Sequence, residues 1–331
     1  MTRGSQEESV VVRGEDELEA ISSDSVPVVK KWVTAVRPFA YSASALAAAL
    51  GAAIAFYLGY PVQWGPLGLT FLGVLCFHTG ANLLNDCFDH RRGLDTQVVP
   101  TSGAVVRGWL TESQVFRAAV ALIVLGIACG LVLTWYAGWV VLLLGLLGAI
   151  FSLGYTTPRF CFKYVGMGDL AIFFSFGILV VFGAFWVQAR EFHWLPVLWS
   201  LQPVMLTVGI LHANNWRDIE SDPAKGCRTV ANMLGSRGSE TYYRVLVIGP
   251  FVLIVACVLL NLVPGLEIHT PVSTLAAFLA LPLAVRLANV KKRGTPEQFA
   301  MLDGSTGQLH LVFTSLCCLA FIAARYFPCI P

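Results

Sequence analysis

The amino-acid sequence predicts an all-α integral membrane protein with about nine transmembrane helices. Hydrophobic residues make up 56% of the 331 residues and charged residues only 13%, whereas soluble domains carry about 25% charged residues. Runs of about 20 mostly apolar residues, the length that spans a bilayer as a helix, recur along the chain. A large soluble core is the alternative, and the length and near absence of charge in these runs argue against it.

The first 31 residues differ from the rest of the chain. They contain seven acidic residues and no apolar segment of the kind found in a signal peptide. We expect residues 1–31 to form a disordered acidic tail and residues 32–331 to form a transmembrane domain in the lipid bilayer. The nine cysteines include no CxxC pair, so neither a zinc site nor a disulfide framework is indicated. No nucleic-acid partner is expected.

Apolar windows define the expected helices in order. The connections after the first, third, fifth and seventh windows are short, whereas those after the second, fourth, sixth and eighth are longer and polar. The windows lie near residues 35–58, 66–86, 115–135, 137–154, 168–188, 194–215, 242–263, 270–288 and 307–327.

Lys and Arg residues are distributed unequally across the predicted membrane. Apart from Arg3 and Arg13 in the tail, eighteen lie beside the N-terminus and in the longer loops, and only Arg190 and Arg325 lie on the opposite side. Cytoplasmic loops carry the excess of Lys and Arg in membrane proteins. We therefore expect the N-terminus and the long loops to be cytoplasmic, in a bacterial inner membrane or an organelle membrane.

Two polar motifs end the second and sixth windows: ANLLNDCFDHRRGLD at residues 81–95 and NNWRDIESDPAKG at residues 214–226. Both follow the pattern N-x-x-[N/D]-x-x-x-D. Positions i, i+3 and i+7 share one face of a helix, so each set is expected to point in one direction. The aligned pairs are Asn82 with Asn215, Asn85 with Asp218 and Asp89 with Asp222. The repetition, four helices apart, suggests an internal repeat.

Carboxylates are concentrated in these motifs. Of the thirteen acidic residues outside the tail, six lie here: Asp86, Asp89, Asp95, Asp218, Glu220 and Asp222. Asp and Asn oxygens suit Mg²⁺, which commonly bridges carboxylates to phosphate oxygens. Two such clusters could therefore clamp a diphosphate between metal ions. Nearby cations that could neutralise a diphosphate are Arg91, Arg92, Lys163, Arg217, Lys225 and Arg228.

A structural interpretation of the motifs is the alternative: they could cap helices and set the topology. The match between the two motifs, on one side of the membrane, favours catalysis. A transporter or a binding protein is the rival class, because polar residues in membranes also mark ion pathways. An inverted repeat would support a transporter, but these motifs lie on the same side. A binding protein would need no paired acids.

These residues resemble the UbiA superfamily of intramembrane aromatic prenyltransferases. The first motif is similar to its NDxxDxxxD motif, with the last Asp displaced by two positions, and DIESD is similar to its DxxxD motif. Within the superfamily, NNWRDIESDPAKGCRT, FKYVGMGDL and RPFAYSAS resemble the 1,4-dihydroxy-2-naphthoate prenyltransferase (MenA) branch and its animal menaquinone-4 relatives. The resemblance covers nearly the whole chain after residue 31 and implies a UbiA-type helical bundle.

The resemblance also implies a set of site residues. Those that would handle Mg²⁺ and diphosphate are Asn85, Asp86, Asp89, Asp95, Asp218 and Asp222. The residues that would contact the diphosphate are Lys163, Arg217 and Arg228, and those that would line the pocket between the motifs are Asn82, Asn214 and Asn215. The expected catalytic residues are Asp89, Asp218, Asp222, Lys163 and Arg217. The displaced spacing leaves open whether Asp95 binds metal directly or through water.

The implied reaction is prenyl transfer in menaquinone biosynthesis. A polyprenyl diphosphate would ionise, and the ring of 1,4-dihydroxy-2-naphthoate would attack carbon 1 of the chain and lose CO₂. A dry pocket with aromatic faces would protect the allyl cation; Tyr155, Phe174 and Phe176 are candidates, with ordinary packing as the alternative for each. Menadione, homogentisate and 4-hydroxybenzoate are alternative acceptors, and the prenyl chain length is left open.

Three polar residues near the motifs have simpler interpretations. Asp169, at the start of the fifth window, is expected to complement a helix dipole, with a role toward the acceptor as the alternative. His78 and His212 each precede a motif by a few residues, and both are expected to be buried and hydrogen-bonded.

Overall fold

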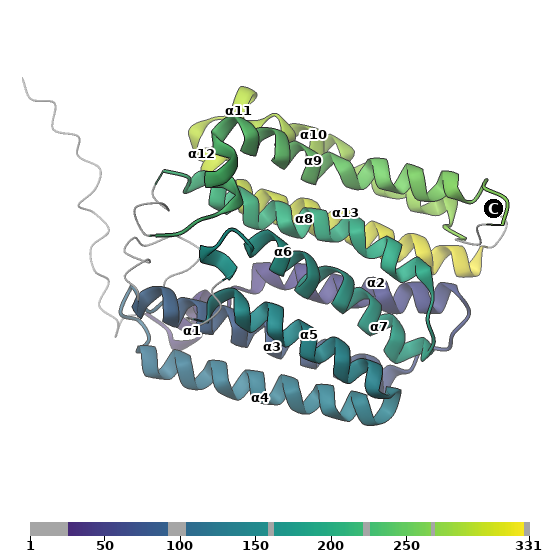
Figure 1. Ribbon diagram of the computed structural model, residues 1–331, viewed down its shortest axis with the longest axis horizontal. Coiled ribbons are helices and arrows are strands. Elements are labelled where there is room, and N and C mark those ends of the chain that lie inside the picture. The colour runs from purple at the N-terminus through teal and green to yellow at the C-terminus, as the bar shows by residue number, and fades with distance from the viewer. Residues whose placement is uncertain (1–25, 92–103, 158–161, 221–225, 266–268, 328–331) are drawn as a thin grey trace, which may run out of the picture.

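Long helices packed side by side along one direction form the protein (Figure 1). The computed structural model describes residues 26–91, 104–157, 162–220, 226–265 and 269–327, and these residues contain no β-strand. The elements are α1 (Val28–Val36), η2 (Pro38–Ala40), α2 (Tyr41–Tyr57), α3 (Trp64–Arg91), α4 (Glu112–Ala137), α5 (Trp139–Thr156), η3 (Phe162–Tyr164), α6 (Gly168–Ile172), η4 (Phe173–Ile178), α7 (Leu179–Ala189), α8 (Trp194–Arg217), α9 (Val230–Leu260), η6 (Val272–Ala280), α10 (Leu281–Ala288), α11 (Val290–Arg293), α12 (Pro296–Ala300) and α13 (Leu302–Tyr326).

The apolar helices confirm the predicted all-helical membrane class. Among the described residues, six helical segments are long and apolar enough to cross a bilayer: α3, α4, α6 to α7, α8, α9 and α13. A seventh results if α1 and α2 form one bent span, and two shorter apolar segments cover Trp139–Tyr155 and Val272–Ala288. These segments follow the order of the predicted windows. The count of nine stays a prediction, because the two shorter segments do not reach the length of a full span.

The first span is bent by 61° between α1 and α2. Arg37 ends α1 in the left-handed conformation, with φ 52°, and Pro38 follows. A residue before proline is disfavoured in the right-handed helical region, so the helix cannot continue straight through this point. The bend carries the Arg37 side chain toward the end of α3, where it pairs with Asp86.

Small residues allow the interior helices to approach closely. A Cβ added to Gly51 in α2 would lie 2.1 Å from the Val181 carbonyl oxygen in α7, and one added to Gly80 in α3 would lie 2.9 Å from the Ala119 carbonyl oxygen in α4. Membrane helices associate through such small-residue contacts, since lipid offers no hydrophobic driving force between them. The contacts fix α3 against α4 and α2 against α7 and thereby set the position of the first motif.

The segment from α6 to α7 contains a π-helical turn, η4. A π-turn widens a helix locally and often accompanies a functional site. Gly177, within this turn, approaches α8 so closely that an added Cβ would lie 2.5 Å from a Val204 methyl carbon. The turn therefore lies against the helix that carries the second motif.

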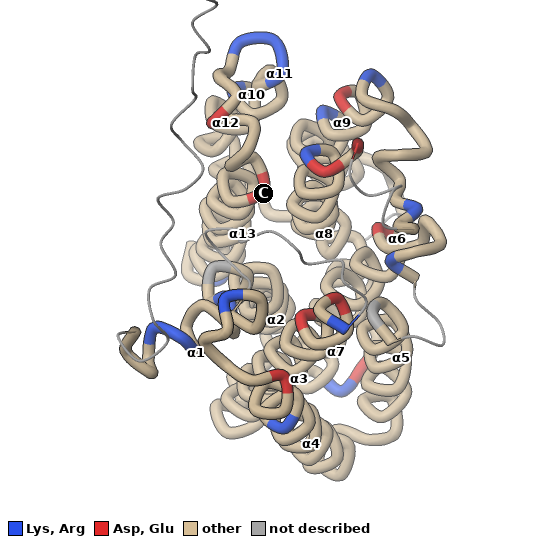
Figure 2. The backbone as a smooth tube through the Cα atoms, turned by 90° about the vertical axis from the view of Figure 1, so that its left-hand side faces the viewer, with Lys and Arg blue, Asp and Glu red and all other residues tan. Residues whose placement is uncertain are grey.

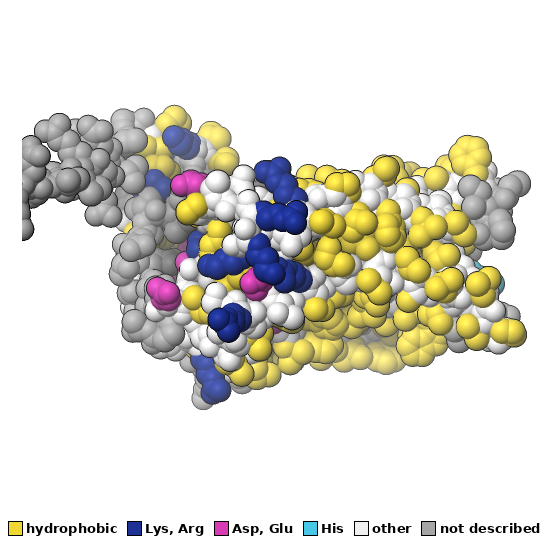
Figure 3. All heavy atoms as spheres, turned by 90° about the horizontal axis from the view of Figure 1, so that it is seen from above, with side chains coloured by type: hydrophobic (Ala, Val, Ile, Leu, Met, Phe, Trp, Pro, Cys, Tyr) yellow, Lys and Arg dark blue, Asp and Glu magenta, His cyan; other side chains and the backbone are white. Residues whose placement is uncertain are grey.

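The two ends of the bundle differ in character. Lys, Arg, Asp and Glu gather at the end where α3 and α8 finish (Figure 2), and hydrophobic side chains cover the face toward the other end (Figure 3). Exposed tryptophans lie at the starts of α3, α5 and α8 and at the end of α4: Trp64, Trp139, Trp194 and Trp135. Tryptophan is enriched at membrane interfaces. One end of the bundle thus carries the motifs, and the other carries an aromatic belt.

Candidate active site

The end of α3 carries the first motif on a continuous helix. Because α3 runs unbroken to Arg91, Asn82, Asn85 and Asp89 share one helical face, as the sequence predicts. Asp86 and Asp89 are 3% and 2% exposed. Burying a charged carboxylate is costly unless it is paired, and each has a cationic partner.

Asp89 is the centre of a polar cluster. Its Oδ2 accepts hydrogen bonds from Lys163 Nζ at 2.7 Å and from Asn85 Nδ2 at 2.7 Å, and its Oδ1 accepts one from the Tyr164 hydroxyl at 2.8 Å. Burial alone would lower the pKa of Lys163, but attraction to Asp89 outweighs it and raises that pKa above its ordinary value. Lys163 therefore stays cationic beside Asp89. Lys163 and Tyr164 come from η3, in the loop between α5 and α6.

Asp86, one position along from the Asn85 face, has a different environment. Its carboxylate forms an ion pair with Arg37, the residue at the bend between α1 and α2. The Arg37 side chain is 25% exposed, whereas the Asp86 side chain is 4% exposed. This pair joins the first span to the end of α3.

The second motif departs from the predicted single helical face. Helix α8 ends at Arg217, and Asp218 is its C-cap residue, whose backbone N–H donates to the Asn214 carbonyl oxygen at 3.2 Å. The helical spacing of the first motif therefore does not extend through the second. Asp222 and Asp95 both lie outside the described residues.

Arg217 organises the second cluster. It donates to both Asp218 carboxylate oxygens, at 3.1 and 3.2 Å, and to Asp303 Oδ2 at 3.3 Å. It also donates to the side-chain oxygen of Asn214 and to the Ala300 carbonyl oxygen, the latter at 3.2 Å. These bonds hold the end of α8 against α12 and α13. Asn215, the neighbour of Asn214, is buried.

Backbone bonds connect the loops around the two clusters. The Arg228 N–H donates to the Tyr164 carbonyl oxygen at 3.3 Å, so the segment before α9 lies against η3. Thr229 then caps α9 in a reciprocal box with Asn232. Asn232 Nδ2 also donates to the Ile219 carbonyl oxygen at 3.0 Å. The loop after α8 and the loop after α5 are thereby held together.

The donor atoms near Asp89 fit a hard cation. Asn85 Oδ1 is buried and has no hydrogen-bond partner among the described residues, and it lies on the residue whose amide nitrogen binds Asp89. An unpaired amide oxygen beside a carboxylate is the ligand chemistry that Mg²⁺ prefers. Within the described ranges, no three His, Cys, Asp or Glu side chains gather as a metal-binding group. Two predicted ligands, Asp95 and Asp222, fall outside those ranges.

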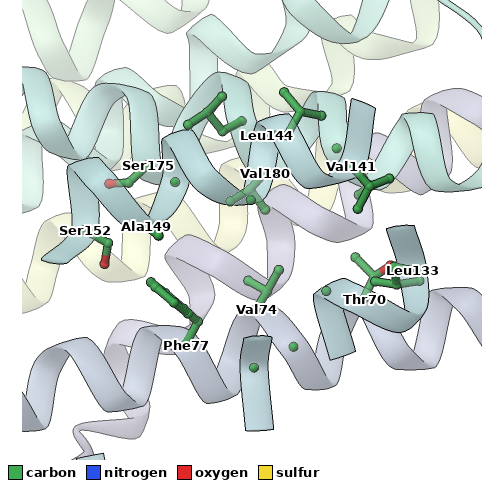
Figure 4. Close-up of a pocket in the computed structure, with 18 of the residues that line it drawn as sticks. Thr70, Val74, Phe77, Leu133, Val141, Leu144, Ala149, Ser152, Ser175 and Val180 are labelled. Carbon is green, nitrogen blue, oxygen red and sulfur yellow. The ribbon is translucent and has the colours of Figure 1, made fainter. Parts of the chain in front are cut away.

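An apolar cavity of about 190 Å³ lies between α3, α4, α5, η4 and α7. Ser152 and Ser175 lie at the end near Phe77, and Thr70, Leu133 and Val141 lie at the far end (Figure 4). His78 also lines the cavity, one helical turn before Asn82, so the cavity begins next to the first motif. Its Nδ1 is hydrogen-bonded to Ser44 Oγ at 2.8 Å, as predicted for a buried histidine.

The three candidate aromatic residues, Phe176, Phe174 and Tyr155, have different surroundings in the structure. Phe176 lines the cavity and packs edge-on against His78, with ring centroids 4.7 Å apart. Phe174 instead stacks on Phe151, with centroids 4.9 Å apart. Tyr155 lies beside the start of α6, where a Cβ added to Gly168 would be 3.4 Å from its ring.

Sequence reasoning missed three residues of these clusters: Tyr164, Arg37 and Asp303. Tyr164 follows Lys163 in the FKYVGMGDL loop. Because Lys163 was predicted as a site residue, its position was the available signal for Tyr164. Arg37 and Asp303 are far from the motifs in sequence, and only the packing of α1 and α13 brings them to the two clusters. The RPFAYSAS segment, which begins with Arg37, was the available signal for that residue, whereas none of the motifs contains Asp303.

Comparisons with known proteins agree with this architecture. The model of the UbiA prenyltransferase family matches residues 42–325. The chain is 30% identical to mouse UbiA prenyltransferase domain-containing protein 1 over 283 residues, which is 85% of this chain and 80% of the mouse protein. The apo structure of a UbiA homolog from Aeropyrum pernix K1 superposes with a TM-score of 0.64 at 16% identity, covering 87% of this chain and 98% of that one. A UbiA homolog from Archaeoglobus fulgidus bound to DMAPP and Mg²⁺ gives 0.59 at 16% identity, covering 88% and 99%.

Proposed function

This chain belongs to the UbiA prenyltransferase family, and we propose that it transfers a polyprenyl chain from a polyprenyl diphosphate to 1,4-dihydroxy-2-naphthoate. The observation that carries the proposal is the Asp89 cluster, in which a buried carboxylate binds Lys163 next to the unpaired Asn85 Oδ1. Such a cluster suits a metal-bound anionic headgroup. Along α3 it lies about two to three helical turns from His78, which lines an apolar cavity that suits an isoprenoid chain.

The residues of the two clusters divide the work on the diphosphate. Mg²⁺, when bound by Asn85, Asp89 and the other predicted ligands, supplies positive charge to the phosphate oxygens. Lys163 and Arg217 neutralise negative charge as the carbon–oxygen bond breaks, which is when that charge grows. Asp218 orients Arg217 through two hydrogen bonds, and Asp89 orients Lys163. Arg228, held near η3 by its backbone, adds a further cation.

The apolar cavity receives the prenyl chain and excludes water from the allyl cation. Water in the cavity would react with that cation, and the prenyl diphosphate would be hydrolysed without transfer to the acceptor. Phe176 presents an aromatic ring to the cavity, and aromatic faces attract cations. The cavity therefore both binds the chain and protects the reactive end.

Acceptor chemistry completes the reaction. The electron-rich ring forms a bond to carbon 1 of the chain, the carbon–oxygen bond to diphosphate breaks, and the ring carboxylate leaves as CO₂, which restores aromaticity. The products are a prenylated naphthalenediol, CO₂ and diphosphate, in keeping with a role in menaquinone biosynthesis. The FKYVGMGDL and NNWRDIESDPAKGCRT segments, which resemble the 1,4-dihydroxy-2-naphthoate branch, favour this acceptor over menadione, homogentisate and 4-hydroxybenzoate.

The test uses the purified full chain in lipid vesicles with geranylgeranyl diphosphate, Mg²⁺ and 1,4-dihydroxy-2-naphthoate labelled in the carboxylate. We expect one equivalent of labelled CO₂ for each prenylated product. A prenylated product that retains the label would contradict the decarboxylating reaction and favour a 4-hydroxybenzoate-type transfer. Vesicles that take up substrate but form no product would favour a transporter.

A further inference from the structure

A third polar cluster lies beside the Asp89 cluster and has no role in the reaction as described so far. It consists of Asp169 at the start of α6, His212 in α8 and Tyr242 in α9. His212 Nδ1 and Asp169 Oδ2 are 3.9 Å apart, and the His212 ring packs edge-on against the Tyr242 ring, with centroids 4.7 Å apart. Three separate elements thus bring a carboxylate, an imidazole and a phenol to one place.

The polar atoms of this cluster lack partners. Both carboxylate oxygens of Asp169 and both ring nitrogens of His212 are buried without a hydrogen bond among the described residues. The Tyr242 phenol lies near the Asp169 carboxylate, and the Ser239 backbone lies near the His212 ring. His212 is fully buried, as expected, and its hydrogen bonding stays a prediction. Buried polar groups are nearly always satisfied, and leaving them unpaired is costly, so this arrangement indicates a bound polar ligand.

The position of the cluster identifies the ligand class. A Cβ added to Gly168, next to Asp169, would lie 3.4 Å from the Tyr155 ring and 3.8 Å from Lys163 Cα. The cluster therefore adjoins the loop that binds Asp89. Tyr242 packs against an apolar cluster formed by Val204, Val208 and Leu246. A ligand here has an apolar body, a polar edge and access to the diphosphate end of the site.

We infer that Asp169, His212 and Tyr242 bind a hydroxyl group of the aromatic acceptor. An ionised carboxylate accepts hydrogen bonds only, and a neutral imidazole both donates and accepts, so a phenolic hydroxyl satisfies both. The acceptor's own carboxylate would be repelled by Asp169, which turns that group toward Lys163. This inference rests on the proposed function, since it assigns the ring-binding part of the same site.

The first test compares 1,4-dihydroxy-2-naphthoate, called the diol below, with its two mono-O-methyl ethers, in each of which one hydroxyl group is blocked. Wild type should lose about 10- to 100-fold in kcat/KM on one ether, because a hydrogen bond to a charged group is lost. Asp169→Asn should lower kcat/KM for the diol. In this variant, kcat/KM for the diol should exceed kcat/KM for the ether that wild type rejects by no more than about twofold. The KM for the prenyl diphosphate should not change. A wild type that accepts both ethers, or an Asp169→Asn variant that still rejects one, would overturn the inference.

Tyr242 and its neighbour supply a matched pair. Tyr242→Phe should raise the acceptor KM by about tenfold, whereas Tyr243→Phe should leave it unchanged, because the Tyr243 hydroxyl is bonded to Thr306 at 2.6 Å. Equal effects of the two substitutions on the acceptor KM would contradict the assignment. Thermal stability of each variant, measured in detergent, separates a folding defect from a binding defect.

Binding without turnover distinguishes this inference from the proposed function. The diol, 1,4-dihydroxy-2-naphthoate, is titrated into purified wild type and purified Asp169→Asn in the absence of prenyl diphosphate. If wild type fails to transfer the prenyl chain but Asp169→Asn binds the diol about tenfold more weakly than wild type does, the proposed function is wrong and the inference stands. If transfer proceeds but the variant binds the diol as wild type does, the inference is wrong.

Discussion

Asp86 and Asp89 are three residues apart on one helix, yet they face different partners. Asp89 binds Lys163, Tyr164 and Asn85, whereas Asp86 pairs with Arg37 at a helix bend. The pattern of acids in the sequence could place both at the membrane boundary. The pattern could not show that Asp86 and Asp89 have different partners, because only tertiary packing brings Arg37 to Asp86 and Tyr164 to Asp89.

This difference predicts unequal effects of removing each charge. Asp89→Asn should lower kcat by more than about 100-fold, because it loosens Lys163 and a predicted metal ligand. Asp86→Asn should lower kcat by less than about tenfold and cost about 1–3 kcal/mol of stability, because it breaks a partly buried ion pair. Steady-state kinetics and thermal denaturation measure the two effects. Equal losses of kcat would show that Asp86 also serves the diphosphate.

Lys163 should act chiefly as the diphosphate departs. Lys163→Met is expected to lower kcat by about 100-fold while changing the KM for prenyl diphosphate by less than about threefold. Lys292→Met, in α11, removes the same charge elsewhere and should leave both constants unchanged. A rise in KM with unaltered kcat for Lys163→Met would reassign this residue to substrate docking.

At the scale of elements, the sequence anticipated helix positions better than helix ends. The apolar windows anticipated the order of the membrane segments because hydropathy alone specifies them. The second motif was expected on one helical face, but α8 ends at Arg217, where Arg217 itself joins α8 to α13 through Asp303. The π-turn at Phe173–Ile178 has no signature in the apolar pattern and was not predicted.

The cavity between α3, α5 and α7 predicts a chain-length effect. Gly148 lines it, and a Cβ added there meets no atom within 4 Å, so a side chain at this position can begin in open space and reduce the volume of the cavity. Gly148→Leu should lower kcat/KM for geranylgeranyl diphosphate at least about tenfold more than for geranyl diphosphate.

Gly68→Leu is the control, since Gly68 is exposed on α3, does not line the cavity and also has free space around an added Cβ. It should leave the preference between the two diphosphates unchanged. If Gly148→Leu also leaves that preference unchanged, the prenyl chain does not occupy this cavity.

At the scale of the whole molecule, charge and aromatic residues orient the bundle. The motif end gathers Lys and Arg (Figure 2), and exposed tryptophans mark the other end. The sequence contained both signals, because topology depends on composition rather than on contacts. We propose that the motif end is cytoplasmic.

Cysteine labelling in sealed vesicles checks this orientation. Glu297 and Glu191 are exposed at opposite ends of the bundle, and the cysteines among the described residues are buried. Glu297→Cys should react with a membrane-impermeant maleimide added from the cytoplasmic side, and Glu191→Cys only from the other side. The parent chain, labelled in parallel, gives the background. The reverse pattern would contradict the orientation.

The central claim is that the two acidic motifs act together on one Mg²⁺-bound diphosphate. Its most direct test is prenyl transfer to 1,4-dihydroxy-2-naphthoate by purified wild type, Asp89→Ala and Asp222→Ala in lipid, with Mg²⁺ and after chelation. Wild type should lose activity on chelation and regain it with Mg²⁺. Each variant should lose at least about 1,000-fold in turnover while keeping the elution profile of wild type. Turnover within about tenfold of wild type in either variant, or full activity without divalent metal, would contradict the claim.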